Sequence, residues 1–196
     1  MLWEPRHPET TYTQLGKGGH SLRVLLLTDL HAGLNQLSLT RLLRAVSDTG
    51  ADVLLFAGDA CSGRYDANKA ARILAALGTV AADAGMPAFA VPGNHDRALG
   101  EQRFASAGIP LLRNRSAMVT ARDGSVWQIA GLDDMRHGTP LFPVREDDIA
   151  VPAERTVALA HNPDAVYLLP AGTARYLLSG HFHGGQIWMP FHFEFR

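Results

Sequence analysis

The stretch LRVLLLTDLH, residues Leu22–His31, joins an almost continuous apolar run to a polar pair, Asp29 and His31. A short apolar run rich in Val and Leu is typical of a strand buried on both faces, as in a parallel or mixed sheet. Four further runs of this kind follow along the chain: Asp52–Ala57, Ala88–Val91, Thr156–Ala160 and Tyr176–Ser179. Together with Leu22–Thr28, these runs predict five buried strands.

Segments of helical composition lie between several of these runs: Leu39–Ser47, the Ala-rich Asn68–Ala84, and Arg97–Ala107. The alternation of apolar runs with helical segments predicts an α/β fold in which helices cover a sheet. Two other apolar runs, Met118–Arg122 and Val126–Ala130, flank the dipeptide Asp123-Gly124. This pattern predicts a hairpin with a tight turn, so some antiparallel strand should lie beside the parallel part.

The composition limits the class of protein. The chain has 196 residues, 46% of them hydrophobic, and a formal net charge of -1. This length and apolar fraction predict one packed domain, residues 1–196, while the charge gives no general attraction to nucleic acid or anionic lipid. The one cysteine, Cys61, excludes an internal disulfide framework, and no stretch approaches the roughly 18 consecutive apolar residues of a spanning helix. We expect a soluble, cytoplasmic protein.

Each of the five predicted strands runs directly into a polar cluster. The clusters are Thr28-Asp29-Leu30-His31, Gly58-Asp59, Gly93-Asn94-His95-Asp96, His161-Asn162-Pro163-Asp164 and Gly180-His181-Phe182-His183-Gly184-Gly185. In open α/β sheets the ligand site lies beyond the carboxyl ends of the strands, so we expect these clusters to converge. The pairs Asp29/His31 and His181/His183 have i, i+2 spacing, which in extended backbone sends both side chains to the same side.

The donor groups in these clusters indicate a metal site. They comprise two carboxylates, one amide and four or five imidazoles, with no thiolate, a set that suits Mn, Fe or Zn better than Ca or Mg. Seven or eight ligands exceed the four that zinc usually takes, which implies two ions, with Asp59 as the shared carboxylate. Two divalent ions and two carboxylates leave a charge of about +2, which favours an anionic phosphate group.

This ordered set of motifs, from about Leu22 to Gln186, resembles the calcineurin-like metallophosphoesterase superfamily. Three stretches resemble its bacterial phosphodiesterase branch: Gly131-Leu132-Asp133-Asp134, His161-Asn162-Pro163-Asp164 and Gly180-His181-Phe182-His183-Gly184-Gly185-Gln186. The resemblance implies an α/β fold of a specific kind, a four-layer α/β/β/α sandwich with a dinuclear metal centre at one edge.

The resemblance also implies roles for individual residues. The implied metal ligands are Asp29, His31 and His183 on one ion, Asn94, His161 and His181 on the other, and Asp59 between them. His95 is implied to contact the phosphate and to protonate the leaving oxygen, while a hydroxide that bridges the ions attacks phosphorus. Two divalent transition metal ions are therefore expected, with Mn favoured and Fe or Zn as alternatives.

The chain departs from the family pattern at Ser62, where many members carry an acidic residue that orients the catalytic histidine. We expect this change to affect the rate more than metal binding, with Asp66 or Asp96 as substitute partners for His95. A second departure is the C-terminus, because only 13 residues follow His183. Phe191–Arg196 alternates apolar and polar residues like a half-buried strand. We therefore expect a second sheet that is shortened, completed differently, or paired through this edge in a dimer.

Several residues also have ordinary explanations. Asn162 and Pro163 fit a helix start, with Asn162 as the cap. Cys61 is expected to be a small buried hydrophobe, and Asp133-Asp134 is expected to be structural. His7, His20, His137 and His192 are expected on the surface, although Arg136 and His137 could reach a substrate.

The favoured function is metal-dependent hydrolysis of a phosphate ester, with diesters preferred over monoesters. Two alternatives stay open: a pyrophosphatase of nucleotide-sugar lipids, and a non-catalytic metal-binding scaffold of the same fold. A nuclease is less favoured, because the near-neutral charge supplies no evident nucleic-acid track. The expected partner is therefore a phosphate-ester substrate.

Overall fold

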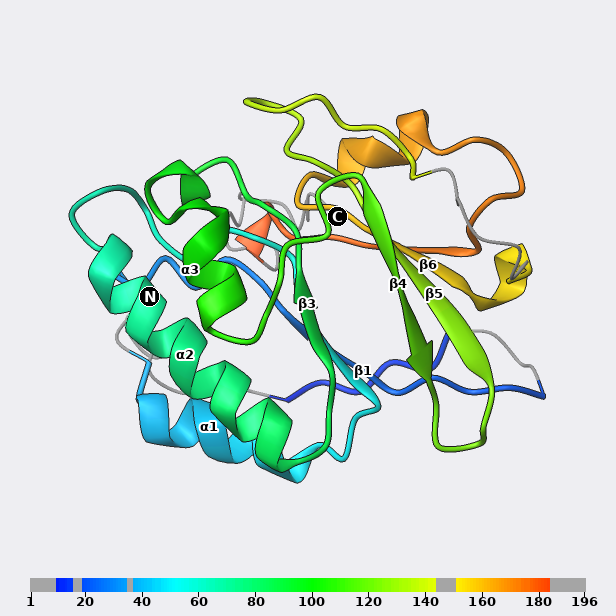
Figure 1. The fold of residues 1–196 in the computed structure, drawn as a ribbon, viewed down its shortest axis with the longest axis horizontal. Helices are drawn as coiled ribbons and strands as arrows, with labels where there is room; N and C mark the ends of the chain where they lie inside the picture. Colours follow the sequence, from blue (N-terminus) through cyan, green and yellow to red (C-terminus); the bar gives the residue numbers. More distant parts are fainter. Residues whose placement is uncertain (1–9, 16–18, 35–36, 144–150, 184–196) are drawn as a thin grey trace, which may run out of the picture.

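The computed structural model describes residues 10–15, 19–34, 37–143 and 151–183, and within these ranges the chain forms a mixed α/β fold with two sheets (Figure 1). The first sheet is parallel, in the order β1 (Val24–Leu27), β2 (Val53–Phe56) and β3 (Ala88–Ala90). The second is mixed, in the order β4 (Arg115–Thr120), β5 (Val126–Gly131), β6 (Thr156–Leu159) and β7 (Tyr176–Leu178). Only β4 and β5 pair antiparallel in the second sheet.

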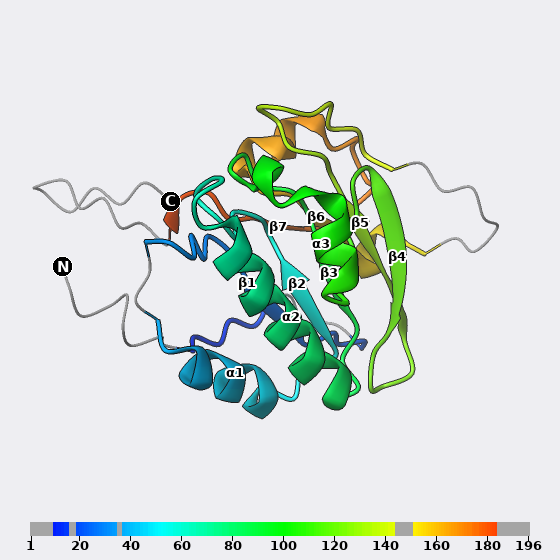
Figure 2. The same cartoon turned by 60° about the vertical axis from the view of Figure 1, so that its left-hand side comes forward.

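The first sheet has α-helices on one face and the second sheet on the other (Figure 2). The α-helices are α1 (Leu39–Asp48), α2 (Ala67–Asp83) and α3 (Gly100–Ser106), and shorter 3-10 helices are η2 (Asp96–Ala98), η3 (Ala153–Arg155) and η4 (Pro163–Leu168). Along β2, Leu54 and Phe56 pack in the cluster with the helices, whereas Val53 and Leu55 pack with the second sheet. Successive residues of a strand point to opposite faces, so a strand covered on both sides must be apolar throughout.

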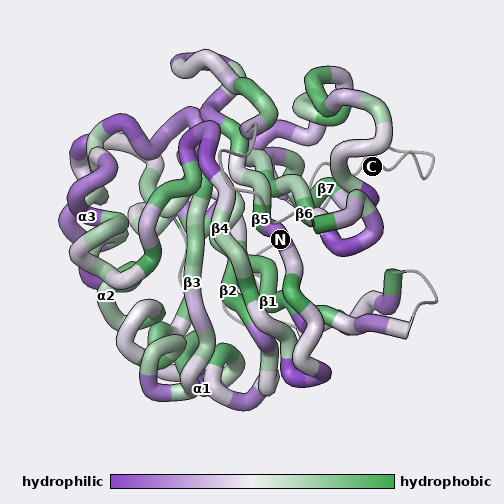
Figure 3. Tube along the Cα trace, turned by 45° about the vertical axis from the view of Figure 1, so that its right-hand side comes forward, coloured by the Kyte–Doolittle hydropathy of each residue, from purple (hydrophilic) through white to green (hydrophobic). Residues whose placement is uncertain are grey.

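The hydropathy of the chain follows this arrangement. The central strands are hydrophobic, and the hydrophilic segments gather mainly in the connecting loops (Figure 3). A third apolar cluster, which contains Leu132, Ala158 and Ala165, lies apart from the core between the sheets. No helix in the described ranges is long and apolar enough to cross a lipid bilayer.

The five predicted strands are present, but they divide between two sheets, and β1 and β7 are only partly buried. The chain leaves the first sheet after β3, where Ala90 pairs with Leu111 in an isolated parallel bridge, and β4 then begins the second sheet. Both faces of β2 are apolar, so a second sheet is needed to cover the face that the helices leave open. The predicted hairpin is confirmed as β4 and β5.

Two other predictions have clear outcomes. The helix predicted at Arg97–Ala107 divides into η2 and α3, because Gly100 has a φ of 69° that an α-helix does not allow. The helix start at Asn162 is confirmed, since its side chain accepts a hydrogen bond from the backbone N–H of Asp164 at 2.8 Å. The predicted strand at Phe191–Arg196, with any edge it offers a partner, lies outside the described residues.

We expect Gly78→Ala to lower the free energy of unfolding by about 2 kcal/mol, although alanine is the better helix former. Gly78 lies in α2 against the end of α3, and a Cβ there would overlap the carbonyl oxygen of Ala107. Urea denaturation measures the change. The neighbouring exposed variant Thr79→Ala is the control and should stay within about 0.5 kcal/mol of the parent. Equal stability of Gly78→Ala and the parent would contradict the close approach of these helices.

Candidate metal centre

The loops that follow five strands meet at one edge of the molecule and are joined by backbone hydrogen bonds. The N–H of Asp29 donates to the carbonyl of Gly58 at 2.9 Å, and the N–H of His31 donates to that of Asp59 at 3.0 Å. The N–H of Gly180 donates to the carbonyl of His161 at 3.0 Å. These bonds tie the loop after β1 to the loop after β2, and the loop after β6 to the loop after β7. The predicted convergence of the polar clusters is therefore seen in the structure.

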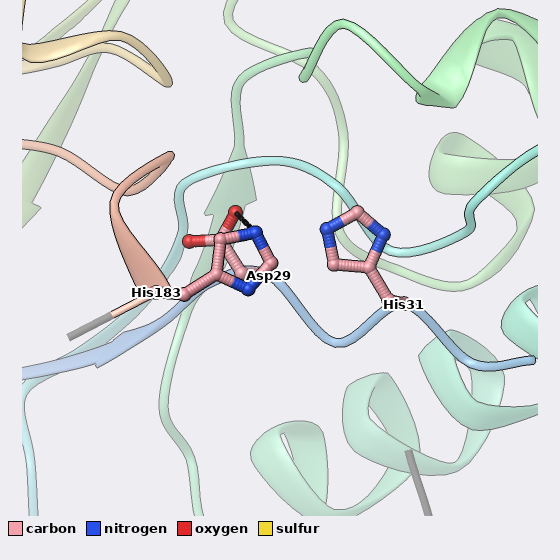
Figure 4. A group of neighbouring side chains, drawn as sticks. All are labelled: Asp29, His31 and His183. Atoms are coloured by element: carbon pink, nitrogen blue, oxygen red, sulfur yellow. Dashed lines mark ion pairs between the residues drawn. The ribbon is translucent and has the colours of Figure 1, made fainter. Parts of the chain in front are cut away.

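Asp29, His31 and His183 form the first cluster of side chains that could hold a metal ion (Figure 4). Each offers one ligand atom within 4.8 Å of the others, and the rings of His31 and His183 stack with centroids 4.8 Å apart. Oδ1 of Asp29 and Nε2 of His31 are buried without a hydrogen-bond partner. A buried polar atom without a partner is costly, so these two atoms fit a bound cation well.

Asp59, His161 and His181 form the second cluster. Nε2 of His161 lies 3.2 Å from Oδ2 of Asp59 and 3.2 Å from Nδ1 of His181. The other ring nitrogen of His161, Nδ1, lies 2.8 Å from the carbonyl oxygen of Ala57 and can only donate to it. This bond leaves Nε2 to face the cluster, which is the arrangement usual for a metal-binding histidine.

Asp59 links the two clusters. Its Oδ2 lies 3.6 Å from Nε2 of His31 in the first cluster and 3.2 Å from Nε2 of His161 in the second. Its Oδ1 accepts the backbone N–H of His95 at 2.9 Å. One carboxylate oxygen thus faces a histidine of each cluster, as a ligand shared by two ions would.

The charges of Asp59 and His161 depend on each other. Although burial raises the pKa of Asp59, the hydrogen bond and positive charge of His161 hold that pKa below its ordinary value. Burial lowers the pKa of His161, but Asp59 raises it above its ordinary value. Burial also lowers the pKa of His31, more than the charge of Asp59 raises it. Asp59 and His161 therefore each favour the charged form of the other.

The loop after β3 completes the site. Asn94 is buried in this loop, and the preceding Gly93 lies so close to Asp59 that a Cβ would overlap the Asp59 carboxylate. The ring of His95 is exposed beside the first cluster, with its centroid 5.4 Å from that of His31. Of the predicted site residues, six lie in the two clusters, and Asn94 and His95 belong to the loop that contacts Asp59.

The backbone of these loops differs from the extended form that the i, i+2 spacing suggested. Asp29, His31, His181 and His183 all have positive φ, between 40° and 75°, and Asp59 has a φ of 58°. The extended-backbone explanation is therefore wrong, and the side chains converge through left-handed turns. Such turns cost non-glycine residues about 1–2 kcal/mol each, so other bonds must hold them.

Two buried carboxylates join the loops after β1, β2 and β3, and no sequence pattern indicated either role. Asp96 accepts the backbone N–H groups of Asp59, Ala60, Cys61 and Gly93 at 2.8 to 3.3 Å. Asp66 accepts those of Gly33, Ser62 and Gly63 at 2.7 to 3.1 Å. In the described ranges neither carboxylate forms a hydrogen bond with the ring of His95. The expectation that one of them orients His95 therefore has no support here, because their oxygens serve the backbone.

Ser62 also differs from the expectation. Its Oγ lies 3.1 Å from Nδ1 of His31, a residue of the first cluster, and within the described part of the chain it forms no hydrogen bond with His95. Cys61 is fully buried, as predicted, and burial raises the pKa of its thiol to about 12. Spacing alone could not reveal the Ser62 contact, because the two loops meet only in the folded chain.

The loop after β5 is mainly structural. Asp133 forms an ion pair with Arg113 at 2.7 Å and accepts the N–H groups of Asp134 and Thr139. His137 is exposed, as expected, and its Nδ1 lies 3.2 Å from Asp134. His137 also lines a cavity of about 210 Å³ that reaches Gly93 and Asp96 beside the site.

We expect Asp96→Asn to lower the free energy of unfolding of the metal-free protein by about 3 kcal/mol, because an amide would leave buried N–H donors unpaired. Burial raises the pKa of Asp96 to about 6, so the carboxylate is ionised at pH 8, where urea denaturation with a chelator measures the effect. Asp83→Asn, at the exposed end of α2, is the matched control and should change stability by less than about 0.5 kcal/mol. Equal losses in the two variants would contradict this role of Asp96.

Comparison with known proteins agrees with this geometry. The family model described as calcineurin-like phosphoesterase matches residues 22–185. The metallophosphoesterase YkoQ of Bacillus subtilis, named as uncharacterized, is 31% identical over 176 residues, which cover 86% of this chain and 63% of YkoQ. The similarly named YkuE of Bacillus subtilis is 26% identical over 203 residues, 96% of this chain and 69% of YkuE. This chain thus spans about two thirds of the length of these relatives.

Two further matches cover less of the chain. The phosphodiesterase YaeI of Escherichia coli is 33% identical over 111 residues, which cover 53% of this chain and 39% of YaeI. Among solved structures, TT1561 of Thermus thermophilus matches 58% of this chain and 50% of its own, with a TM-score of 0.40 and 19% identity. Because the family model matches most of the sequence, and its matched region contains every residue of the two clusters, the chain belongs to the calcineurin-like phosphoesterase family.

Proposed function

We propose that this protein is a metal-dependent hydrolase of phosphodiesters with a dinuclear centre. The observation that carries the proposal is the position of Asp59 Oδ2, within 3.6 Å of a histidine nitrogen from each cluster. The proposed ligands of one ion are Asp29, His31 and His183, and those of the other are Asn94, His161 and His181, with Asp59 shared. Nitrogen and carboxylate donors without thiolate favour Mn, with Fe or Zn as alternatives.

When bound, divalent ions at this position would lower the pKa of a water molecule and offset the charge of the phosphate. Residues around the proposed ligands fix the loops that carry them. Asp96 and Asp66 fix the loops through backbone N–H groups, and Ala57 fixes the orientation of His161. The donor set is therefore ordered before a substrate arrives, which reduces the reorganisation needed during the reaction.

His95 is the proposed general acid. Its backbone N–H is held by Asp59 Oδ1 at 2.9 Å, so its position is coupled to the shared ligand. Its exposed side chain, with the ring beside that of His31, is accessible to the leaving oxygen of a bound ester. Protonation of that oxygen by a placed imidazole typically raises a rate by about 10²–10⁴-fold.

The preference for diesters is supported by the similarity to YaeI, which is named a phosphodiesterase. We also infer that residues 1–196 form one domain of the four-layer α/β/β/α type. The apolar cluster around Leu132, Ala158 and Ala165 supports this inference, because it lies apart from the core between the sheets and indicates a further layer on the second sheet.

We expect the protein to bind two equivalents of Mn per chain, and Asp59→Asn to bind fewer, because the shared ligand loses its charge. Metal analysis after equilibrium dialysis measures this. His20→Ala is the control and should keep two equivalents, because this exposed histidine lies beside Asp123 in the β4–β5 turn and in neither cluster. One equivalent or fewer in the parent protein under saturating Mn would contradict the dinuclear centre.

We expect His95→Ala to lower kcat on an activated diester by at least about 10²-fold while its Mn content stays at the parent level. Steady-state kinetics and metal analysis on the same preparation measure both quantities. A parent that binds Mn but hydrolyses no ester would favour the metal-binding scaffold instead.

Substrate class is tested with a panel of monoesters, diesters and UDP-linked pyrophosphates assayed with Mn. The expected order places diesters first. Faster cleavage of every monoester than of every diester would contradict the proposed preference, and selective cleavage of the pyrophosphates would favour the pyrophosphatase alternative.

A further inference from the structure

Ser62 contacts the one ring nitrogen of His31 that does not face the metal centre. Its Oγ lies 3.1 Å from Nδ1 of His31, and the ring is buried. The opposite nitrogen, Nε2, lies 3.6 Å from Oδ2 of Asp59 and has no hydrogen-bond partner. The two nitrogens of this ring thus face different surroundings, a hydroxyl on one side and the cluster of candidate ligands on the other.

The position of Ser62 relative to His31 is fixed by the backbone. Asp66 accepts the N–H groups of Ser62 and Gly63 from one loop and that of Gly33 from the other, at 2.7 to 3.1 Å. The N–H of His31 itself donates to the carbonyl of Asp59 at 3.0 Å. Asp66 is buried, so water competes little for these bonds. The backbone of Ser62 is therefore held beside His31 by bonds that do not involve the ring.

A neutral imidazole carries its proton on one nitrogen only, and the other nitrogen is then free to bind a metal. The Ser62 hydroxyl can accept from Nδ1 or donate to it; when it accepts, the proton stays on Nδ1 and the lone pair stays on Nε2, which is the form that a metal bound at Nε2 requires. Partners of this kind fix the ring orientation of metal ligands, and their loss typically weakens metal binding by about 10–100-fold.

We propose that Ser62 is a positioning residue for His31, which selects the tautomer protonated at Nδ1 and so presents Nε2 to the metal. This inference rests on the proposed metal centre, since it assigns His31 as a ligand through Nε2. Loss of the Ser62 hydroxyl should therefore weaken metal binding at the first cluster. Loss of a residue that oriented His95 would instead slow proton transfer.

The first experiment needs no metal. Nitrogen-15 chemical shifts of the His31 ring in the metal-free protein at pH 8 report which nitrogen carries the proton. We expect the Nδ1-protonated form in the parent and in Ser62→Thr, which keeps the hydroxyl, and a mixture of both forms in Ser62→Ala. A ring protonated at Nε2 in the parent would overturn the inference, and so would an unchanged Nδ1-protonated ring in Ser62→Ala.

The second experiment measures Mn affinity by calorimetry. We expect Ser62→Ala to weaken one of two binding events by about 10–100-fold and to leave the other within about 3-fold of the parent. Ser62→Thr should restore most of the lost affinity, and Ser116→Ala, an exposed serine of β4, is the matched control. Mn affinity in Ser62→Ala equal to that of the parent would overturn the role of Ser62 and leave the metal centre intact. A parent that binds no Mn would overturn both.

Discussion

Three loops of the candidate metal centre, those after β1, β2 and β3, depend on one kind of interaction, the acceptance of backbone N–H groups by buried carboxylates. Asp96 gathers four such groups from the loops after β2 and β3, and Asp66 gathers three from the loops after β1 and β2. Each carboxylate joins segments that are about 30 residues or more apart in the sequence. Removing either carboxylate would leave several buried N–H donors without partners. These bonds therefore favour a single conformation of the loops that they join.

This arrangement explains how the loops tolerate their backbone conformation. Five of the six non-glycine residues with positive φ in the described ranges belong to the candidate site, and each conformation is unfavourable for an isolated residue. Asp66 and Asp96 join the loops after β1, β2 and β3, and the N–H of His181 donates to Oδ2 of Asp29 at 2.9 Å. The strain is thus concentrated where donor atoms must converge, while the strands and helices keep ordinary geometry.

The same loops relate electrostatics to the proposed chemistry. Asp59 and His161 stabilise each other's charged forms, and Oδ1 of Asp29 and Nε2 of His31 are buried without a hydrogen bond among the described residues. A bound cation would satisfy those two atoms. The family membership and the buried donor atoms without hydrogen bonds both support a bound metal ion at these loops.

Much of the fold could be predicted from local patterns, because burial on two faces requires continuous apolar runs and a tight Asp123-Gly124 turn marks the hairpin. The division of the strands between two sheets could not be predicted from these patterns, because it depends on which apolar faces pack against each other. Six of the seven predicted ligands meet in two clusters, because the ends of the strands meet at one edge. Their binding of metal and the role of His95 stay predictions.

The sequence by itself determined which donor groups are present, their order along the chain, and their position at strand ends. Only the tertiary structure decided that Asp66 and Asp96 bind backbone rather than His95, that Ser62 faces His31, and that the i, i+2 pairs converge through left-handed turns. The physical reason is that strand burial is a property of neighbouring residues, whereas a hydrogen bond between two loops depends on distances that exist only after the sheets have assembled.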